Sequence, residues 1–160
     1  MQISATIKEY QYREIDDYTL LNDFECGVSC MDKDLHSELV REEIKANHYI
    51  PYGAFDKEGS LVAFFAVGQD RYEDKGFAFE IAYLAVRKDM QRGGIGKACI
   101  REIVKMAREN EYKIVTVSAL SITSSSEKYE AVSFYRHCGF RQLELQQKGM
   151  TVVPMWRPID

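Results

Sequence analysis

The chain has 160 residues, of which 46% are hydrophobic and 29% are charged. This length and composition predict one soluble globular domain, residues 1–160, with a sizeable core. A formal net charge of −4 argues against nucleic-acid binding through bulk charge. No apolar run is long enough to span a bilayer, and the first residues lack the pattern of a signal peptide. We therefore expect a cytoplasmic protein with reduced thiols and no membrane partner.

The first half of the chain alternates between strand-like and helical patterns. Residues 2–10 predict an opening strand, and residues 16–24 predict a short helix. Between residues 30 and 48, apolar side chains recur at helical spacing among many charges, which predicts one surface helix that Pro51 ends. Polar turns then separate apolar runs, which predicts strands joined in hairpins over residues 52–55, 61–67 and 77–86.

The second half of the chain starts with a change to the helical period over residues 95–110. A buried strand is expected at 114–120, followed by a short helix at 127–137 that Gly139 closes. Two further apolar segments predict a closing strand pair over residues 140–145 and 150–156. This order of elements predicts an α/β fold with a mixed sheet whose two faces are covered by helices.

A glycine-rich loop joins the predicted strand that ends at Val86 to the helix that follows. Its sequence is Gln91-Arg92-Gly93-Gly94-Ile95-Gly96-Lys97. Glycines allow positive φ and close backbone approach, so consecutive N–H groups can converge on a phosphate. The start of the helix adds unpaired donors and the positive end of its dipole. The loop is therefore interpreted as a phosphate cradle.

Two common phosphate-binding motifs do not fit this loop. A P-loop aligned on Gly96-Lys97 would need glycine at Gln91 and a hydroxyl at Ala98. A dinucleotide-binding fingerprint that starts at Gly94 would need glycine at Cys99. The pattern that the loop does contain is Q-x-x-G-x-G.

Gln91, Gly94 and Gly96 resemble the pyrophosphate motif of the GNAT acetyltransferase superfamily. Residues 131–140 resemble the A-x-x-x-Y-x-x-x-G-F block of the same family, and the whole resemblance covers residues 77–140. It implies an α/β (α+β) GNAT fold with a mixed, mostly antiparallel central sheet of about six to seven strands, flanked by about four helices. It also implies an acetyl-CoA-dependent N-acetyltransferase that acts on a primary amine by direct attack.

The resemblance implies a role for each matching residue. Tyr135 would lie near the thioester sulfur and protonate the leaving thiolate. Glu80 stands where the histone-acetylating branch has its general base, which the reaction needs because an amine of pKa about 10 arrives mostly protonated. Two groups of residues would hold acetyl-CoA: Leu84, Ala85 and Val86 the pantetheine arm, and Gln91, Arg92, Gly93, Gly94, Ile95, Gly96 and Lys97 the pyrophosphate.

Each of these roles has a plainer alternative. The loop can be a tight strand-to-helix turn, Tyr135 a core aromatic, and Glu80 a solvated carboxylate. Strand alternation places Glu80 on the same face as Ala82 and Leu84. Lys128 stands where many family members carry an Asn that touches the cofactor, so the contacts of that loop are expected to differ.

Two further groups of residues have side chains that bind ligands in other proteins. Cys26, Cys30 and His36 match no zinc-binding spacing, so no metal is expected. Basic side chains share one face of the predicted helix at 95–110, which is typical of a solvated surface. The first two of them can reach a phosphate of coenzyme A; the full set is Lys97, Arg101, Lys105 and Arg108.

The beginning of the chain resembles one branch of the GNAT family. Residues 24–27 and 31–35 resemble its F-x-C-G…L-D-x-x-L segment, and residues 154–156 resemble its closing segment. This branch includes toxins that acetylate the amino acid on charged tRNA. The net negative charge favours a small-molecule or peptide amine as the acceptor. Acetylation of charged tRNA is the second hypothesis. A non-catalytic acyl-CoA sensor is the third, and a homodimer is kept as one option for assembly.

Overall fold

A computed structural model of the chain describes residues 9–72, 76–123, 128–142 and 152–159. The described strands are β1 (Gln11–Glu14), β2 (Ile50–Phe55), β3 (Leu61–Tyr72), β4 (Gly76–Val86), β5 (Ile114–Thr123), β6 (Lys128–Glu130), β7 (Arg141–Gln142) and β8 (Val152–Pro158). The described α-helices are α1 (Ser29–Leu35), α2 (Glu38–Ala46), α3 (Ile95–Glu109) and α4 (Val132–His137). Single 3-10 turns occupy Tyr18–Leu21 and Lys88–Met90.

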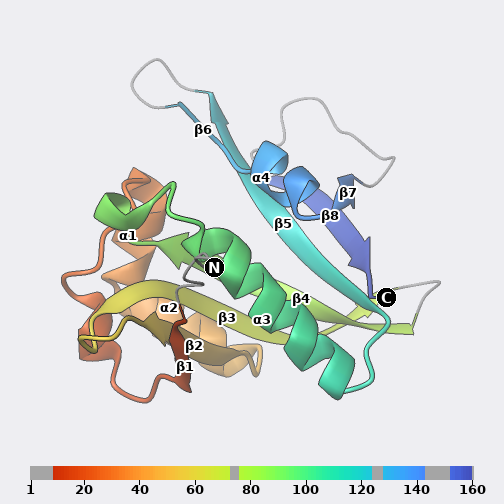
Figure 1. Ribbon diagram of the computed structural model, residues 1–160, viewed down its shortest axis with the longest axis horizontal. Coiled ribbons are helices and arrows are strands. Elements are labelled where there is room, and N and C mark those ends of the chain that lie inside the picture. The colour runs from red at the N-terminus through yellow and green to blue at the C-terminus, as the bar shows by residue number, and fades with distance from the viewer. Residues whose placement is uncertain (1–8, 73–75, 124–127, 143–151, 160) are drawn as a thin grey trace, which may run out of the picture.

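The strands form one sheet in the order β1-β2-β3-β4-β5-β8-β7, with β6 paired to β5 off this path. All pairs are antiparallel except β4 with β5, which are parallel over only three residue pairs, Phe79↔Val115 to Ile81↔Val117. Beyond these pairs the two strands separate (Figure 1). We call this opening the fork. The predicted fold class is confirmed.

Helices cover both faces of the sheet, as predicted. In Figure 1, α3 crosses in front of the sheet. Its apolar side, which includes Ile95, Cys99 and Ile103, is buried in one core together with α4. Residues of α1 and α2 form a second core on the other face, where Val40 and Ile44 are buried. The two faces of the sheet therefore carry different helices, and the fork lies between them.

The predicted helix over residues 30–48 is instead two helices, so this expectation was wrong. Ser37, between α1 and α2, is extended with φ −108° and ψ 160°. Its hydroxyl donates to the Asp34 carbonyl at 2.9 Å, and the His36 ring nitrogen Nε2 contacts the Phe24 carbonyl oxygen at 2.6 Å. Such side-chain bonds compete with the helical ladder and end α1.

The predicted helix over 127–137 was also too long. Its first described residues form β6, which pairs with β5, and the helix begins only at Val132. The reason is that β5 continues to Thr123 and offers a ladder to the returning chain.

Other boundaries shift less. The predicted helix at 16–24 is a single 3-10 turn, and the first described strand, β1, follows the predicted opening strand, most of which lies outside the described residues. The closing strand pair is present as β7 and β8, while residues 143–151 between them lie outside the described part of the chain.

Candidate active site

A β-bulge in β4 sets the direction of the side chains beside the fork. In the pairing with β3, Ala66 lies opposite Tyr83 and Val67 lies opposite Ile81, so Ala82 is an extra residue. Ile81 and Leu84 consequently both pack towards α3. The expectation that Leu84 shares a face with Glu80 is therefore wrong, because one inserted residue reverses the alternation.

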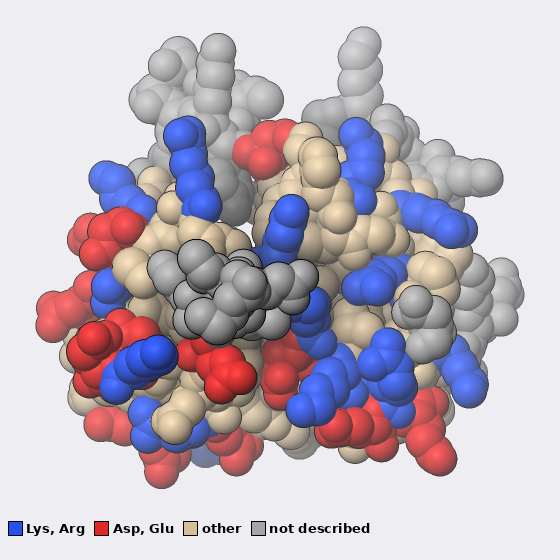
Figure 2. Space-filling model, in the orientation of Figure 1, with Lys and Arg blue, Asp and Glu red and all other residues tan. Residues whose placement is uncertain are grey.

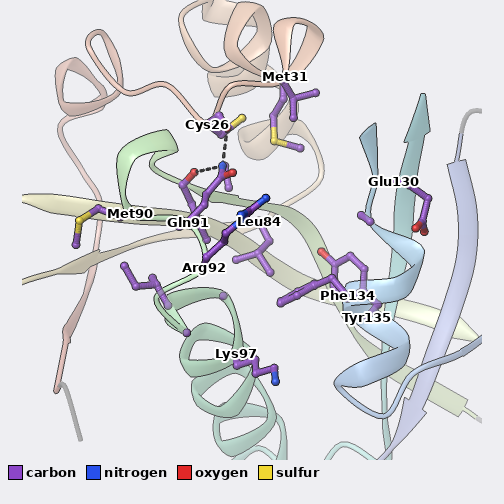
Figure 3. Close-up of a pocket in the computed structure, with 17 residues that line it drawn as sticks. Cys26, Met31, Leu84, Met90, Gln91, Arg92, Lys97, Glu130, Phe134 and Tyr135 are labelled. Atoms are coloured by element: carbon purple, nitrogen blue, oxygen red, sulfur yellow. Dashed lines mark hydrogen bonds between the residues drawn. The ribbon is translucent and has the colours of Figure 1, made fainter. Parts of the chain in front are cut away.

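A cavity of about 410 Å³ opens beside β4 at the fork. Its walls come from the end of β4, the glycine loop, the segment before α1, and α4. Tyr135 lines it together with all the predicted acetyl-CoA contacts except Gly93: Leu84, Ala85, Val86, Gln91, Arg92, Gly94, Ile95, Gly96 and Lys97. In Figure 3 the Tyr135 hydroxyl points into the cavity from the side opposite Gln91.

The glycine loop presents backbone donors at one end of this cavity. Gly94 caps α3 with φ +85°, a conformation that glycine adopts without strain. The Ala98 N–H donates to the Gly94 carbonyl at 3.0 Å within α3. The N–H groups that come before Ala98 in the first turn therefore have no acceptor within the helix and point out of its end. A Cβ built at Gly94 meets nothing within 4 Å, which marks open space in front of these donors. The loop therefore fits a diphosphate.

The Gln91 side chain ties the loop to two other segments. Its amide nitrogen donates to the Cys26 carbonyl at 2.6 Å and to the Val86 carbonyl at 3.1 Å, the dashed lines of Figure 3. The Lys88 N–H also donates to the Glu25 carbonyl at 2.7 Å. The side chain of Gln91 thus acts as a brace for the loop, while its backbone lines the cavity.

The segment that resembles the toxin-containing branch forms the wall next to Gln91. The Asp32 carboxylate accepts from the Cys26 N–H at 2.7 Å and from the Gly27 N–H at 3.1 Å, and this holds the turn in front of α1. Cys26, Val28 and Met31 then line the cavity. The sequence analysis did not assign these three residues to the site, although the motif that contains them could have pointed to it.

The thiol of the cysteine that lines the cavity, Cys26, is protected by burial. Burial raises the pKa of Cys26 to about 12, so its thiol stays neutral. Among the described residues, no group of three or more His, Cys, Asp or Glu side chains gathers in a way that could hold a metal ion.

Tyr135 is fixed in position by its neighbours on and after α4. It is only 6% exposed, and its ring makes edge contacts with Phe134 and Phe140 at centroid distances of 5.1 and 5.4 Å. Glu130 caps the start of α4 by accepting from the Ser133 N–H and hydroxyl, both at 2.8 Å. Burial raises the pKa of Glu130, but the bonds from Ser133 outweigh burial and lower it overall. The carboxylate that holds α4 is therefore charged at neutral pH.

Glu80 lies on the other face of the sheet, below α1 and α2. It is half-buried and accepts a hydrogen bond from the Tyr49 hydroxyl. The Tyr49 ring reaches Glu80 because it lies on Gly68, which is opposite Glu80 in the β3–β4 register. A Cβ at Gly68 would lie 2.5 Å from the Tyr49 ring. Glu80 is not among the described residues that line the cavity at the fork.

Charge is distributed unevenly around the site. Figure 2 shows Lys and Arg side chains spread over the part of this face where α3 and α4 lie. Lys97 lines the cavity, and the half-buried thiol of Cys138 feels the positive charges of Lys97, Arg157 and Arg101, which oppose the effect of burial on its pKa. The end of the cavity near α3 is therefore electropositive.

The sequence matches the Acetyltransferase (GNAT) domain family over residues 8–157. The chain belongs to the GNAT acetyltransferase family. The predicted enzyme class, acetyl-CoA-dependent acetyl transfer, is confirmed with it. In the described part of the chain, no helix has the length and apolar character needed to cross a membrane.

Several solved structures share the fold of this GNAT protein. A bacterial toxin has a TM-score of 0.68 and 16% identity over 96% of this chain and 92% of its own. The AtaTR complex bound with acetyl-CoA has a TM-score of 0.67 and 15% identity over 94% of each chain. A Bacillus subtilis acetyltransferase in complex with CoA has a TM-score of 0.62 and 15% identity over 94% of this chain and 99% of its own. No curated protein matches the sequence.

Proposed function

We propose that the protein is an N-acetyltransferase that moves the acetyl group of acetyl-CoA onto a primary amine of a small molecule or peptide by direct attack. One observation carries this proposal: a single cavity at the fork has the donors of the glycine loop at one end and the Tyr135 hydroxyl at the other. When bound, acetyl-CoA supplies the acetyl group as a thioester.

The donor half of the site binds acetyl-CoA mainly through the backbone. The first turn of α3 and the loop before it would hold the pyrophosphate. The β4–β5 ladder ends at the Ile81–Val117 pair, so the edge of β4 that faces the fork is not covered by β5 at Leu84, Ala85 and Val86. That edge would pair with the amide groups of the pantetheine arm, as an added strand would.

Two side chains would handle protons. Tyr135, buried against the cavity, would give its hydroxyl proton to the sulfur that leaves. Glu80 would accept a proton from the amine, and its place outside the cavity lining favours transfer through an intervening water. Tyr49 would keep the Glu80 carboxylate in a fixed orientation.

A second candidate is acetylation of the amino acid on charged tRNA. The toxin structures among the fold relatives and the basic groups beside the cavity, Lys97, Arg101 and Arg157, favour it. The formal net charge of −4 opposes it, because a protein that grips several phosphates is normally basic.

Salt dependence and growth separate the two candidates. Acetylation of charged tRNA should fall by orders of magnitude between about 50 and 200 mM salt if about six phosphates are held. We expect instead weak salt dependence toward small amines, no acetylation of charged tRNA and no growth arrest on expression. Growth arrest that disappears with Tyr135→Phe would overturn the preferred function and establish the second.

A further inference from the structure

A second, smaller cavity of about 40 Å³ lies inside the fork. We call it the side cavity. It shares four lining residues with the cavity beside the glycine loop: Met31, Leu84, Ala131 and Tyr135. Because the proposed function places the thioester sulfur at the Tyr135 hydroxyl, the side cavity begins where the acyl group of the bound donor would lie.

The last residue pair of the β4–β5 ladder closes one end of the side cavity. Ile81 and Val117 form this pair, line the cavity and are only 2% and 6% exposed. The bulged residue of β4, Ala82, lines the cavity as well and contributes only a methyl group. The paired strands therefore close the side cavity in the direction of Glu80, which precedes Ile81 in the ladder.

Two apolar side chains, Met31 of α1 and Leu120 of β5, line the side cavity on the face of α1 and α2, where both pack against the second core. Met31 lines both cavities, and its unbranched side chain can adapt to the group beside it. Leu120 lines the side cavity but not the cavity beside the glycine loop. Leu120 is therefore a position at which the size of the side cavity can be changed without replacing a residue that lines the rest of the donor site.

The lining of the side cavity suits an uncharged group. Among the described residues, none that lines it has a charged side chain, and most are apolar. The hydroxyl of Tyr83, which also lines it, already donates to the Glu43 carboxylate. The volume of the cavity is roughly three times the space that one water needs. A short chain of carbon atoms therefore fits, whereas a carboxylate would be buried there without a charged partner, at a high cost.

We propose that the side cavity receives the part of the acyl chain that extends beyond an acetyl group, so that the donor site also binds propionyl-CoA and butyryl-CoA. This rests on the proposed function and names the class of donor: a thioester of a short, saturated and uncharged acyl group. The longer chain leaves water as it enters the cavity, and this favours binding. The alternative occupant is water, which a longer chain would have to displace from its polar partners.

The test measures the Kd of acetyl-CoA, propionyl-CoA and butyryl-CoA by calorimetric titration, which needs no acceptor amine. Each methylene that is buried should lower the Kd about fourfold, so butyryl-CoA should bind about tenfold more tightly than acetyl-CoA. Succinyl-CoA is the matched control, because it has a chain of the same length that ends in a carboxylate, and it should bind no more tightly than acetyl-CoA. A Kd that stays equal or rises from acetyl-CoA to butyryl-CoA would overturn the inference, as expected if the cavity holds only water.

Two variants at Leu120 test whether the side cavity is the source of this preference. Leu120→Phe should fill the cavity and bring the Kd values of butyryl-CoA and acetyl-CoA together, whereas Leu39→Phe, at a position 66% exposed on α2, should keep the tenfold difference. Leu120→Ala should enlarge the cavity, so that hexanoyl-CoA binds more tightly than butyryl-CoA. A folded Leu120→Phe protein that keeps the full preference would overturn the role of the side cavity. Failure of the unaltered protein to bind any of these thioesters would instead contradict the proposed function.

Discussion

The two sides of the fork recognise their proposed ligands in different ways. On the donor side, the proposed cradle would use backbone N–H groups of one continuous stretch, from Gln91 to Lys97, beside an electropositive end of the cavity. On the acceptor side, the proposed base Glu80 and its hydrogen-bond partner Tyr49 come from two separate segments and act through their side chains. The donor side should therefore tolerate side-chain loss but not added bulk, whereas the acceptor side should respond to the loss of single atoms.

The largest effect is expected from adding bulk and negative charge to the donor side. Acetyl-CoA at about 100 times its Kd should stabilise the protein by roughly 2.7 kcal/mol. Gly94→Glu should abolish this stabilisation, because its side chain fills the open space in front of the donors. Differential scanning fluorimetry with and without acetyl-CoA measures it.

Gly59→Glu provides the control for backbone strain. Gly59 also has a positive φ, +81°, and lies in an open hairpin turn. Its variant should lose stability yet keep the full acetyl-CoA shift. Equal acetyl-CoA-induced shifts in melting temperature for the Gly94 variant and the unaltered protein would show that this loop does not bind the pyrophosphate.

The next largest effect tests the boundary between the two sides, at Tyr135. Tyr135→Phe keeps the ring contacts with Phe134 and Phe140 but removes the proton donor, so kcat should fall by about 10². The Kd of acetyl-CoA should stay nearly constant in a calorimetric titration. Tyr112→Phe, which loses a hydroxyl bonded to Gln69 at the surface, should leave kcat unchanged. A kcat unaffected by Tyr135→Phe would reduce Tyr135 to a core aromatic.

A smaller and pH-dependent effect is expected on the acceptor side. Glu80→Gln keeps the shape but removes the base, so kcat/KM should fall about tenfold near pH 7. Because the free amine becomes plentiful as pH rises toward its pKa of about 10, the deficit should shrink at alkaline pH. A pH–rate profile of the variant parallel to that of the unaltered protein would leave Glu80 with a structural role only.

The smallest effect tests whether the Gln91 side chain supports acetyl-CoA binding only indirectly, by holding the loop in place. Gln91→Ala removes two hydrogen bonds, each worth about 0.5–1.5 kcal/mol, but leaves the backbone donors in place. We expect a few-fold rise in the KM for acetyl-CoA, about threefold, with kcat unchanged. Gln69→Ala is the surface control. A loss of acetyl-CoA binding as complete as in Gly94→Glu would show that the side chain, and not the backbone, dominates.

That the proposed donor residues line one cavity could be predicted, because they are nearly contiguous and their spacing follows from the geometry of a loop that opens a helix. The acceptor side could not, apart from Glu80. The Tyr49–Glu80 bond joins residues 31 positions apart, and it forms only because Gly68 leaves room for the ring. The bulge at Ala82 has no signal in the sequence, so alternation assigned Leu84 to the wrong face.

The predicted helix boundaries were wrong for a similar reason: contacts with other segments of the chain set them. The division between α1 and α2 depends on contacts of His36 and Ser37 with backbone carbonyls that the periodicity of apolar residues does not reveal. The strand β6 depends on the length of its neighbour β5. In both cases, tertiary contacts outweighed the local pattern.

The short parallel pairing between β4 and β5 joins the two halves of the sheet. Two antiparallel blades, β1–β4 and β5–β8, meet along three residue pairs, whereas β3 and β4 pair along nearly their whole length. The softest deformation of the sheet is therefore a change in the angle between the blades. A ligand that pairs with the uncovered edge of β4 and also contacts α4 would connect the two halves of the sheet. Binding of acetyl-CoA would therefore restrict the relative movement of these halves, and with it the positions of the acceptor groups.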